Sequence, residues 1–439
     1  MADEFIHRRV WRLAGPIILA NISVPLLGLV DTAVVGHLPG PHFVGAVAIG
    51  ALVFNVLYFG LGFLRMGTTG LAAQALGSGN ADEVRATLVR AVLVAVALGI
   101  VMVTIRRPVA WAALSIIAPS DAVFPLADTY ISVRIWGAPA ALANAAMMGW
   151  FIGVHNTRAV LAQQLVMNGL NIVLDLVFVI GLGYGVAGVA AASLIAQVAA
   201  PLFGLWLVRR DLARIGGRWR RDLIFDGTRI RRMLAVNRDI FLRTIFLISS
   251  NVVFISVGAK MGDVVLAANA ILFQFHHLAA WTLDGFAYAT EALTGSAVGA
   301  GDRQRFREAV RVTGLWALGL ASGFTLAYLL FGTLLIDVVT DVAAVREMAR
   351  VFLPWAVIIP IVSVWGFMLD GIFIGATRVA EMRNTMMVTV TLYFGAVALL
   401  VPYLGNHGLW LSVTFLSVMR AVTMGFLYPR VERAVGKTG

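Results

Sequence analysis

The chain has no cysteine and little charge. The absence of cysteine from its 439 residues excludes disulfide bonds and thiol chemistry. Charged residues make up only 13% of the sequence and apolar residues make up 60%, whereas a typical soluble domain is about one quarter charged and about half apolar. A soluble core could not bury so much apolar surface, so the composition predicts an integral membrane protein.

Motifs of the common membrane enzymes are also missing. The sequence contains no H-E-x-x-H, no paired-aspartate diphosphate motif and no glycine-rich phosphate loop followed by lysine. With no catalytic constellation and no ATP-hydrolysing segment, the chain is predicted to be a secondary transporter driven by an ion gradient, and not an enzyme. No metal or resident cofactor is expected, only H+ or Na+ as a coupling ion.

Long apolar stretches fill most of the chain. A helix needs about 20 residues to cross about 30 Å of hydrocarbon, and twelve stretches reach that length. The predicted spans are 11–36, 44–75, 86–105, 124–152, 159–182, 186–207, 236–258, 266–298, 309–336, 348–375, 383–403 and 408–428. The expected fold class is therefore an all-α membrane protein with twelve transmembrane helices.

Two pairs of segments repeat at the same offset. Gly-Ser-Gly-Asn at 77–80 returns as Gly-Ala-Gly-Asp at 299–302, and Phe-Ile-Gly at 151–153 returns at 373–375. An equal offset in two separate places predicts an internal repeat with six spans in each half. Because six is even, both halves enter the membrane from the same side. The pattern predicts two parallel six-helix lobes around a central cavity.

An arginine-rich stretch separates the two halves. We predict an N-terminal lobe at 1–207, a basic cytoplasmic linker at 208–235 and a C-terminal lobe at 236–439. The first apolar run carries Asp31 and is too long for a cleaved signal peptide, so it is expected to remain as the first span.

The net charge of +11 is unevenly placed along the chain. Arginines crowd the N-terminus, the linker, the C-terminus and the turns after the second, eighth and tenth spans, which all fall on one side of the membrane. The positive-inside rule then predicts a multi-pass protein of the bacterial inner (plasma) membrane with both termini in the cytoplasm. The charge follows the topology, so membrane lipid is an expected partner and nucleic acid is not.

Ionisable groups inside the spans are costly and point to function. Asp31 in the first span and Asp175 in the fifth lie at similar depth, and Asn171 shares a helix face with Asp175. Ser193 and Tyr130 reach the same layer from two other spans. Oxygen-bearing side chains from four helices predict a small-cation or proton site. The alternative is that each is bonded to a neighbour and simply packs helices together.

The second half carries a different polar set. Its intramembrane acids and tyrosine are Asp284, Tyr288 and Glu291 in one stripe, and Asp370 in the tenth span. Their expected partners are the intramembrane arginines Arg65, Arg134 and Arg243. We interpret these residues, with Arg65 among them, as a charge network that gates the lobes; direct contact with substrate is the alternative.

Two further groups have weaker interpretations. His276 and His277 point about 100° apart on a helix, so they cannot close on one metal ion and are expected to face the pore or to pack. Four tryptophans could line a cavity for amphipathic compounds or could face lipid and core: Trp136, Trp150, Trp281 and Trp365.

The first span and three later motifs together resemble a known family. The segments are GPIILANISVPLLGLVDTAVVGHL, NIVLD, LDGFAYATEA and LDGIFIGATR. They are similar to the multidrug and toxic compound extrusion (MATE) family, in particular its DNA-damage-inducible protein F (DinF) branch, in register from about residue 8 to 430. The resemblance implies an antiporter of twelve helices with two six-helix lobes and a cavity open alternately to each side.

The resemblance also implies roles for single residues. In that branch the N-lobe acids bind the coupling cation while the first span bends at a proline; the matching positions are Pro16, Asp31, Tyr130, Asn144, Asn171, Asp175 and Ser193. Ser193 stands where the family has threonine. The glutamate that another branch uses in the seventh span has no counterpart here, which argues against a second-lobe cation site of that kind.

These observations predict a cation-coupled antiporter, with H+ favoured over Na+, that exports organic, often cationic or amphipathic, toxic compounds by alternating access. Two acids buried side by side can hold a proton when closed to water and release it when hydrated. Pro16 and Pro25 each remove a backbone hydrogen bond from the first span, which would ease its bending; simple tolerance of proline is the alternative. A monomer is expected. The alternative functions are a lipid-linked sugar flippase of the same superfamily and an integral membrane enzyme.

Overall fold

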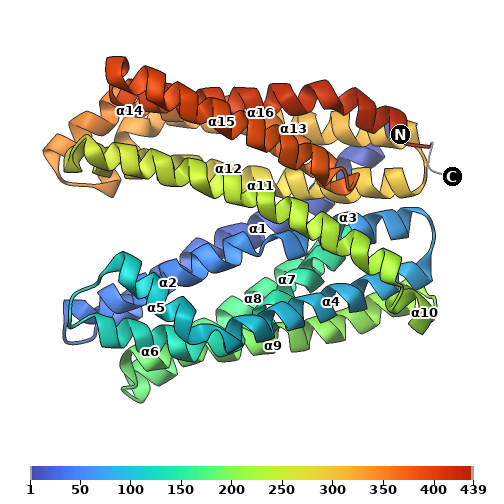
Figure 1. Cartoon of the computed structure of the whole chain (residues 1–439), viewed down its shortest axis with the longest axis horizontal. Coiled ribbons are helices and arrows are strands. Elements are labelled where there is room, and N and C mark those ends of the chain that lie inside the picture. Colours follow the sequence, from blue (N-terminus) through green and yellow to red (C-terminus); the bar gives the residue numbers. More distant parts are fainter. Residues whose placement is uncertain (1, 437–439) are drawn as a thin grey trace. The chain divides into compact units, whose positions relative to one another are not determined.

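The computed structural model describes residues 2–436, and within that range the chain is helical without any strand (Figure 1). Twelve helical segments in it are long and apolar enough to cross a membrane, which confirms the predicted fold class. The helices are α1 (Ala2–Gly36), α2 (Pro41–Gly60), α3 (Phe63–Gly77), α4 (Ala81–Thr104), α5 (Arg106–Ile117), α6 (Phe124–Arg134), the 3-10 turn η1 (Ile135–Gly137), α7 (Ala138–Gly153), α8 (Thr157–Asp175), the π-helical segment η2 (Leu176–Gly181), α9 (Gly185–Ile215), α10 (Arg221–Ile224), α11 (Gly227–Lys260), α12 (Asp263–Gly299), α13 (Arg303–Val339), α14 (Ala343–Gly375), α15 (Val379–Leu404) and α16 (Asn406–Ala434).

The chain divides into two compact units. We call residues 19–237 the N-lobe, and residues 1–18 together with 238–439 the C-lobe. The division falls within two long helices, α1 and α11, so the first 18 residues belong with the second half of the chain. Within the C-lobe both chain ends contact α13: the indole of Trp316 donates to His7 Nδ1 over 2.9 Å, and Arg303 pairs with Glu432 at 2.9 Å.

The internal repeat is visible in the backbone at an offset of 222 residues. Helix α2 begins at Pro41 and α12 at Asp263, and α8 begins at Thr157 and α15 at Val379. The residues with positive φ pair at the same offset: Gly79 with Gly301, His155 with Thr377, and Gly183 with Gly405. Matching turns therefore delimit matching helices, and the duplicated frame follows directly from the sequence.

Helix caps and close helix crossings repeat as well. Asn80 and its counterpart Asp302 each cap the next helix, accepting a backbone N–H at 2.9 Å. Gly153 lies so close to α3 that a Cβ there would approach Thr69 O to 2.8 Å, and a Cβ at Gly375 would approach Glu291 O to 2.5 Å. Each lobe thus needs glycine at the same crossing.

Four helices are broken in the N-lobe where their C-lobe counterparts are continuous. The break between α2 and α3 lies at Gly60-Leu61-Gly62. At the equivalent residues, Thr282-Leu283-Asp284, α12 continues without a break. A second break, at Ile105, separates α4 from α5. The third is the η1 turn between α6 and α7, and the fourth is the π-helical η2, which follows Asp175 directly. Two glycines remove side-chain support from a helix turn, which explains the first break.

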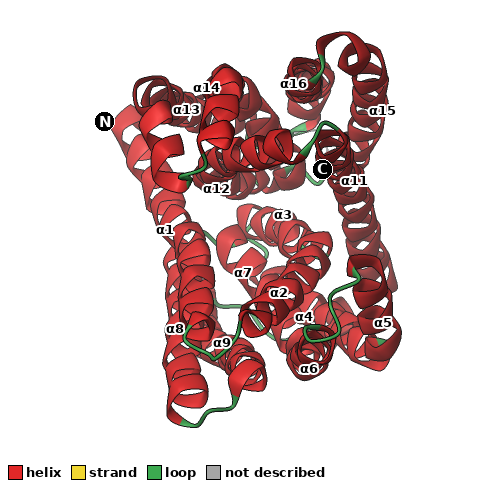
Figure 2. Ribbon diagram, turned by 90° about the vertical axis from the view of Figure 1, so that its left-hand side faces the viewer, coloured by secondary structure: helices red, strands yellow, loops and turns green. Residues whose placement is uncertain are grey.

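The predicted linker at 208–235 is mostly helical. Helix α9 extends to Ile215, α10 spans Arg221–Ile224 and α11 begins at Gly227. Contacts to α4 hold these turns: Glu83 forms an ion pair with Arg229, and Arg90 donates to the carbonyl of Leu223. The sequence showed the basic composition of this segment but not the acceptors that fix it in place. Short loops join the helices elsewhere (Figure 2).

Candidate functional site

The carboxyl pair of the N-lobe joins α1 to α8. Asp175, the last residue of α8, is fully buried, and its Oδ2 accepts a hydrogen bond from Asn171 Nδ2 at 2.9 Å. Asp31 on α1 is half-buried and is a side-chain hydrogen-bond partner of Asp175. Two carboxyl groups can share a hydrogen bond only when one of them carries a proton. Oδ1 of each has no partner among the described residues.

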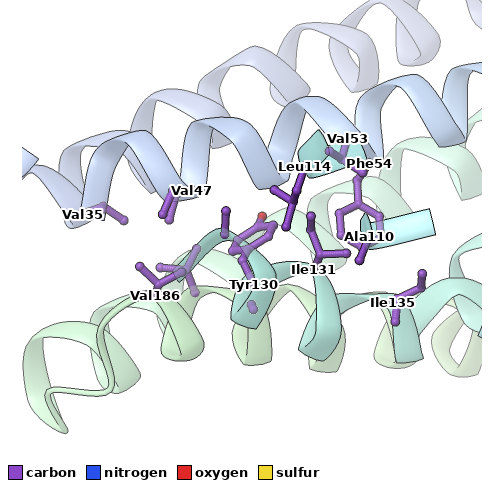
Figure 3. Close-up of a cluster of buried hydrophobic side chains, with 14 of the residues drawn as sticks. Val35, Val47, Val53, Phe54, Ala110, Leu114, Tyr130, Ile131, Ile135 and Val186 are labelled. Carbon is purple, nitrogen blue, oxygen red and sulfur yellow. The ribbon is translucent and has the colours of Figure 1, made fainter. Parts of the chain in front are cut away.

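Tyr130, Arg134 and Ser193 extend this cluster from α6 and α9. Arg134 Nη1 donates to Tyr130 Oη over 2.5 Å, and the Tyr130 hydroxyl also interacts with Ser193. The Arg134 guanidinium lies 4.8 Å from the ring centre of Phe54, a cation–π contact. Tyr130 itself sits in an apolar core that includes Val47 and Phe54 (Figure 3). The tyrosine therefore links the polar cluster to the packing of the N-lobe.

The cluster has a defined charge balance. Asp31, Asp175 and Arg134 interact electrostatically with one another. With both carboxyls ionised and the guanidinium protonated, the three side chains carry a net charge of −1. Low-dielectric surroundings penalise that excess. One bound monovalent cation, a proton or a metal ion, makes the cluster neutral.

The structure brings together five of the six predicted coupling residues and places the sixth elsewhere. Asn144 on α7 accepts a hydrogen bond from Gln163 of α8, and Gln163 also donates to Ala200 O of α9 at 3.2 Å. Asn144 thus belongs to an amide network nearer the start of α8. Pro16 lies within α1, which is helical throughout its described length.

The C-lobe has its own charged cluster. Arg243 of α11 and Arg420 of α16 both donate to Oδ2 of Asp370 on α14. The predicted partnership of Arg243 with Asp370 is confirmed. Arg243 also interacts electrostatically with Asp284 and Glu291 of α12. The acids of the second half are therefore gathered around arginines of the same lobe.

The prediction that Arg134 pairs with the acids of the second half was wrong. Arg134 bonds to Tyr130 in the N-lobe, because four residues along α6 place both side chains on one helix face. Arg65, also in the N-lobe, is buried where α3 meets Gly149 of α7. His276 and His277 are packed: both contact Phe273, and His277 stacks on Trp281 at 5.8 Å.

The sequence analysis missed several site residues. Arg420 was not named as a partner of Asp370. Gln197 was not named either, although it is buried and follows Ser193 by four residues on α9. Gln164 and Asn168 continue the face of Asn171 and Asp175. Their three- and four-residue spacing was the available signal.

Comparison with known proteins identifies the class of transporter to which this geometry belongs. The MatE family model matches residues 16–177 and 240–403, one match in each half. The chain belongs to the multidrug and toxic compound extrusion family, and it is a transporter rather than an enzyme.

Individual relatives cover nearly the whole chain. The chain is 42% identical to DNA damage-inducible protein F of Escherichia coli, over 96% of its own length and 92% of that protein. It is 26% identical to the probable multidrug resistance protein NorM of Xanthomonas axonopodis, over 73% and 72%. A multidrug resistance MATE family transporter of the MOP superfamily, solved in an outward-facing conformation, matches with a TM-score of 0.87 at 21% identity, over 98% and 97%.

Proposed function

We propose that the protein is a cation-coupled antiporter that exports organic, often cationic or amphipathic, toxic compounds by alternating access, and that Asp31 and Asp175 bind the coupling cation. One observation carries the proposal: two carboxyls on separate helices are paired inside an apolar lobe. Such a pair holds one extra positive charge and releases it when water or a competing cation arrives. Transport class and family membership are consistent with this role.

Within the proposal, the coupling ion is H+. A proton needs one carboxylate, whereas Na+ needs about five or six oxygens around it. The oxygens available are few, because Ser193 is engaged with Tyr130 and Asn171 presents its N–H to Asp175. Arg134 adds a fixed positive charge beside the pair, which disfavours a second metal cation. The charge balance gives one cation for each transport cycle.

The remaining parts of the proposal concern the C-lobe and orientation. We assign the Arg243–Asp370–Arg420 cluster to gating, because ion pairs of this kind can exist in two arrangements. The arginine-rich turns support a cytoplasmic location for both termini, in a protein of the inner membrane. The protein is proposed to act as a monomer.

The test separates the two ions. In sodium-free proteoliposomes, a pH gradient alone should drive ethidium in the efflux direction, and Asp31→Asn should abolish this movement while leaving the protein inserted and folded. Asn keeps the shape of Asp but cannot gain or lose the charge. Transport that begins only after sodium is added would replace H+ by Na+. Full transport by Asp31→Asn at normal expression would remove the carboxyl pair from the mechanism.

A further inference from the structure

Helix α8 carries a buried polar stripe that ends at the carboxyl pair. Its members are buried, with none more than 6% exposed: Gln163, Gln164, Asn168, Asn171 and Asp175. The last four share one helix face, and Gln163 points about 100° to one side of it. At 1.5 Å per residue all five together extend over about 18 Å of the helix. We call the first four the amide stripe. It leads from Asp175 toward Thr157, the end of α8 on the arginine-rich side of the N-lobe.

Hydrogen bonds connect the amide stripe to three neighbouring helices. Gln164 Nε2 donates to Asn168 Oδ1 at 3.1 Å, and Asn168 Nδ2 donates to Ser23 Oγ of α1 at 2.9 Å. Gln163 contacts Asn144 on α7 and a carbonyl of α9. Gln163 Oε1 is buried and has no partner among the described residues. An unused acceptor therefore remains beside the face that the other amides share.

The C-lobe shows that the fold does not require this stripe. The residues at the equivalent positions of α15 are Thr385, Met386, Val390, Tyr393 and Val397. Met386 and Val390 are 1% exposed, so the apolar versions pack as tightly as the amides. Burying an amide costs free energy unless every polar atom is bonded. A lobe that can be built with apolar residues at these positions carries the amides for another purpose.

We propose that the amide stripe is the path along which the coupling cation passes between the carboxyl pair and the Thr157 end of α8. The proposal rests on the proposed function, because it needs a cation at Asp31 and Asp175. Amide oxygens replace part of the hydration shell of a monovalent cation, or hold the waters along which a proton moves. At the positions of Gln164, Asn168 and Asp175, α15 carries Met386, Val390 and Val397, which offer neither.

The path is closed in this structure by α1. Asn168 is bonded to Ser23, and Asp175 to Asp31 eight residues further along α1. Between these contacts α1 is held weakly, since none of its residues from 21 to 33 is buried. The contacts to Asn168 and Asp175 hold α1 against the stripe, with no buried residue between them. Movement of α1 away from α8 opens the amides to water.

The test transfers C-lobe residues into the stripe. Asn168→Val and Gln164→Met introduce the residues found at the equivalent C-lobe positions, Val390 and Met386. The C-lobe shows that the repeated helix packing accepts these side chains. Proteoliposomes of one orientation, selected through a C-terminal tag, receive a pH jump at constant sodium, or a sodium jump at constant pH. Time-resolved infrared spectroscopy follows the carboxyl bands, which Asp31→Asn and Asp175→Asn assign. The cation alone is the probe, so no transported compound need be known.

The expected result separates rate from affinity. Each substitution should slow the carboxyl signal about tenfold or more, because a charge passing an apolar side chain meets a higher barrier. The equilibrium midpoint of the signal should stay unchanged. Asn168→Ser, which restores an oxygen, should recover most of the rate. Leu165→Val on the exposed face of α8 should change neither quantity.

Three outcomes would overturn the path. The first is an unchanged rate in a folded Asn168→Val protein, and the second is an Asn168→Ser protein as slow as Asn168→Val. The third is a shifted midpoint with an unshifted rate, which would place the amides in the binding site instead. If neither jump changes a band that depends on Asp31 or Asp175, the proposed coupling site itself is wrong, and the path is lost with it.

Discussion

The two lobes share a frame and differ in what they bury. At the positions of Asp31, Tyr130, Asn171, Asp175 and Ser193, the C-lobe carries Val253, Phe352, Tyr393, Val397 and Phe415. Phe352, Tyr393 and Val397 belong to the apolar core of that lobe. A six-helix bundle of this topology is therefore stable without the polar cluster. The N-lobe cluster is a specialisation of one copy.

The breaks in the helices follow the same division. Both glycines of the α2–α3 break and the π-helical turns after Asp175 occur in the N-lobe only, where the corresponding C-lobe helices are continuous. Interrupted helices in membrane transporters are tolerated where they line a binding site. The difference teaches that caps and close crossings are common to both copies, whereas the helix breaks and the paired carboxyls of Asp31 and Asp175 belong to the N-lobe alone among the described residues.

The largest effect is expected when Asp175 of the N-lobe is replaced by valine, the residue at the equivalent C-lobe position, Val397. Asp175→Val should reduce ethidium efflux to background in cells that lack other exporters, because the carboxyl pair is lost. The protein should remain folded, since an apolar residue can replace a buried acid at little cost to stability. Efflux and the Tm of the purified protein are the measurements. Retained efflux would show that the lobes are functionally equivalent at this position.

A smaller but severe effect is expected in the C-lobe. Asp370→Asn leaves Arg243 and Arg420 without the carboxylate that they share, which should cost about 3–5 kcal/mol and lower the Tm of the purified protein. The N-lobe supplies the control. Its residues at these positions are Met148, Asn21 and Val198, so the triple change Asp370→Met, Arg243→Asn, Arg420→Val should recover stability. A single substitution without effect on Tm would contradict a structural role for the ion pairs.

Matched glycine substitutions test whether the equivalent helix crossings of the two lobes are packed alike. Gly375→Ala and Gly153→Ala each place a methyl group against a backbone carbonyl of the crossing helix. Each should cost about 1–3 kcal/mol through overpacking, with Gly375→Ala the more costly because its Cβ approaches closer. Thermal unfolding of both variants in detergent is the measurement. A large loss in one lobe and none in the other would show that the crossings are not equivalent.

The smallest effects concern the arginines that tie the sixth helix of each lobe. Arg85 donates to the carbonyls of Gly216 and Leu212 at 2.6 and 2.8 Å, and its counterpart Arg307 pairs with Glu432 at 2.5 Å. Arg85→Ala should cost about 1–2 kcal/mol. Arg307→Ala should cost less, because its side chain is 59% exposed and water screens the pair. Urea-dependent unfolding would reveal a reversed order.

The sequence predicted the frame more fully than the contacts. The membrane spans follow from the composition, and the internal repeat follows from the constant offset between matching segments. The Arg243–Asp370 partnership follows from the cost of burying an unpaired charge. The position of Asn144 did not follow, because depth along a helix does not specify the direction of a side chain. Arg134 was predicted to pair with acids of the wrong lobe, because complementary charge allows many pairs and only the tertiary fold selects one. The helical linker depended on acceptors distant in sequence, such as Glu83.

The π-helical segment after Asp175 has a consequence for direction. A π turn bonds each residue to the fifth along instead of the fourth, so side chains after Asp175 leave the face that the amides occupy. The residues that follow are apolar; Val179 is buried, whereas Leu176 and Ile180 are largely exposed. The polar face of α8 therefore ends at Asp175, where the backbone changes to π-helical turns. In the proposed path, the cation can continue beyond Asp175 only by transfer to another helix. The side chain in position to receive it is Asp31 on α1.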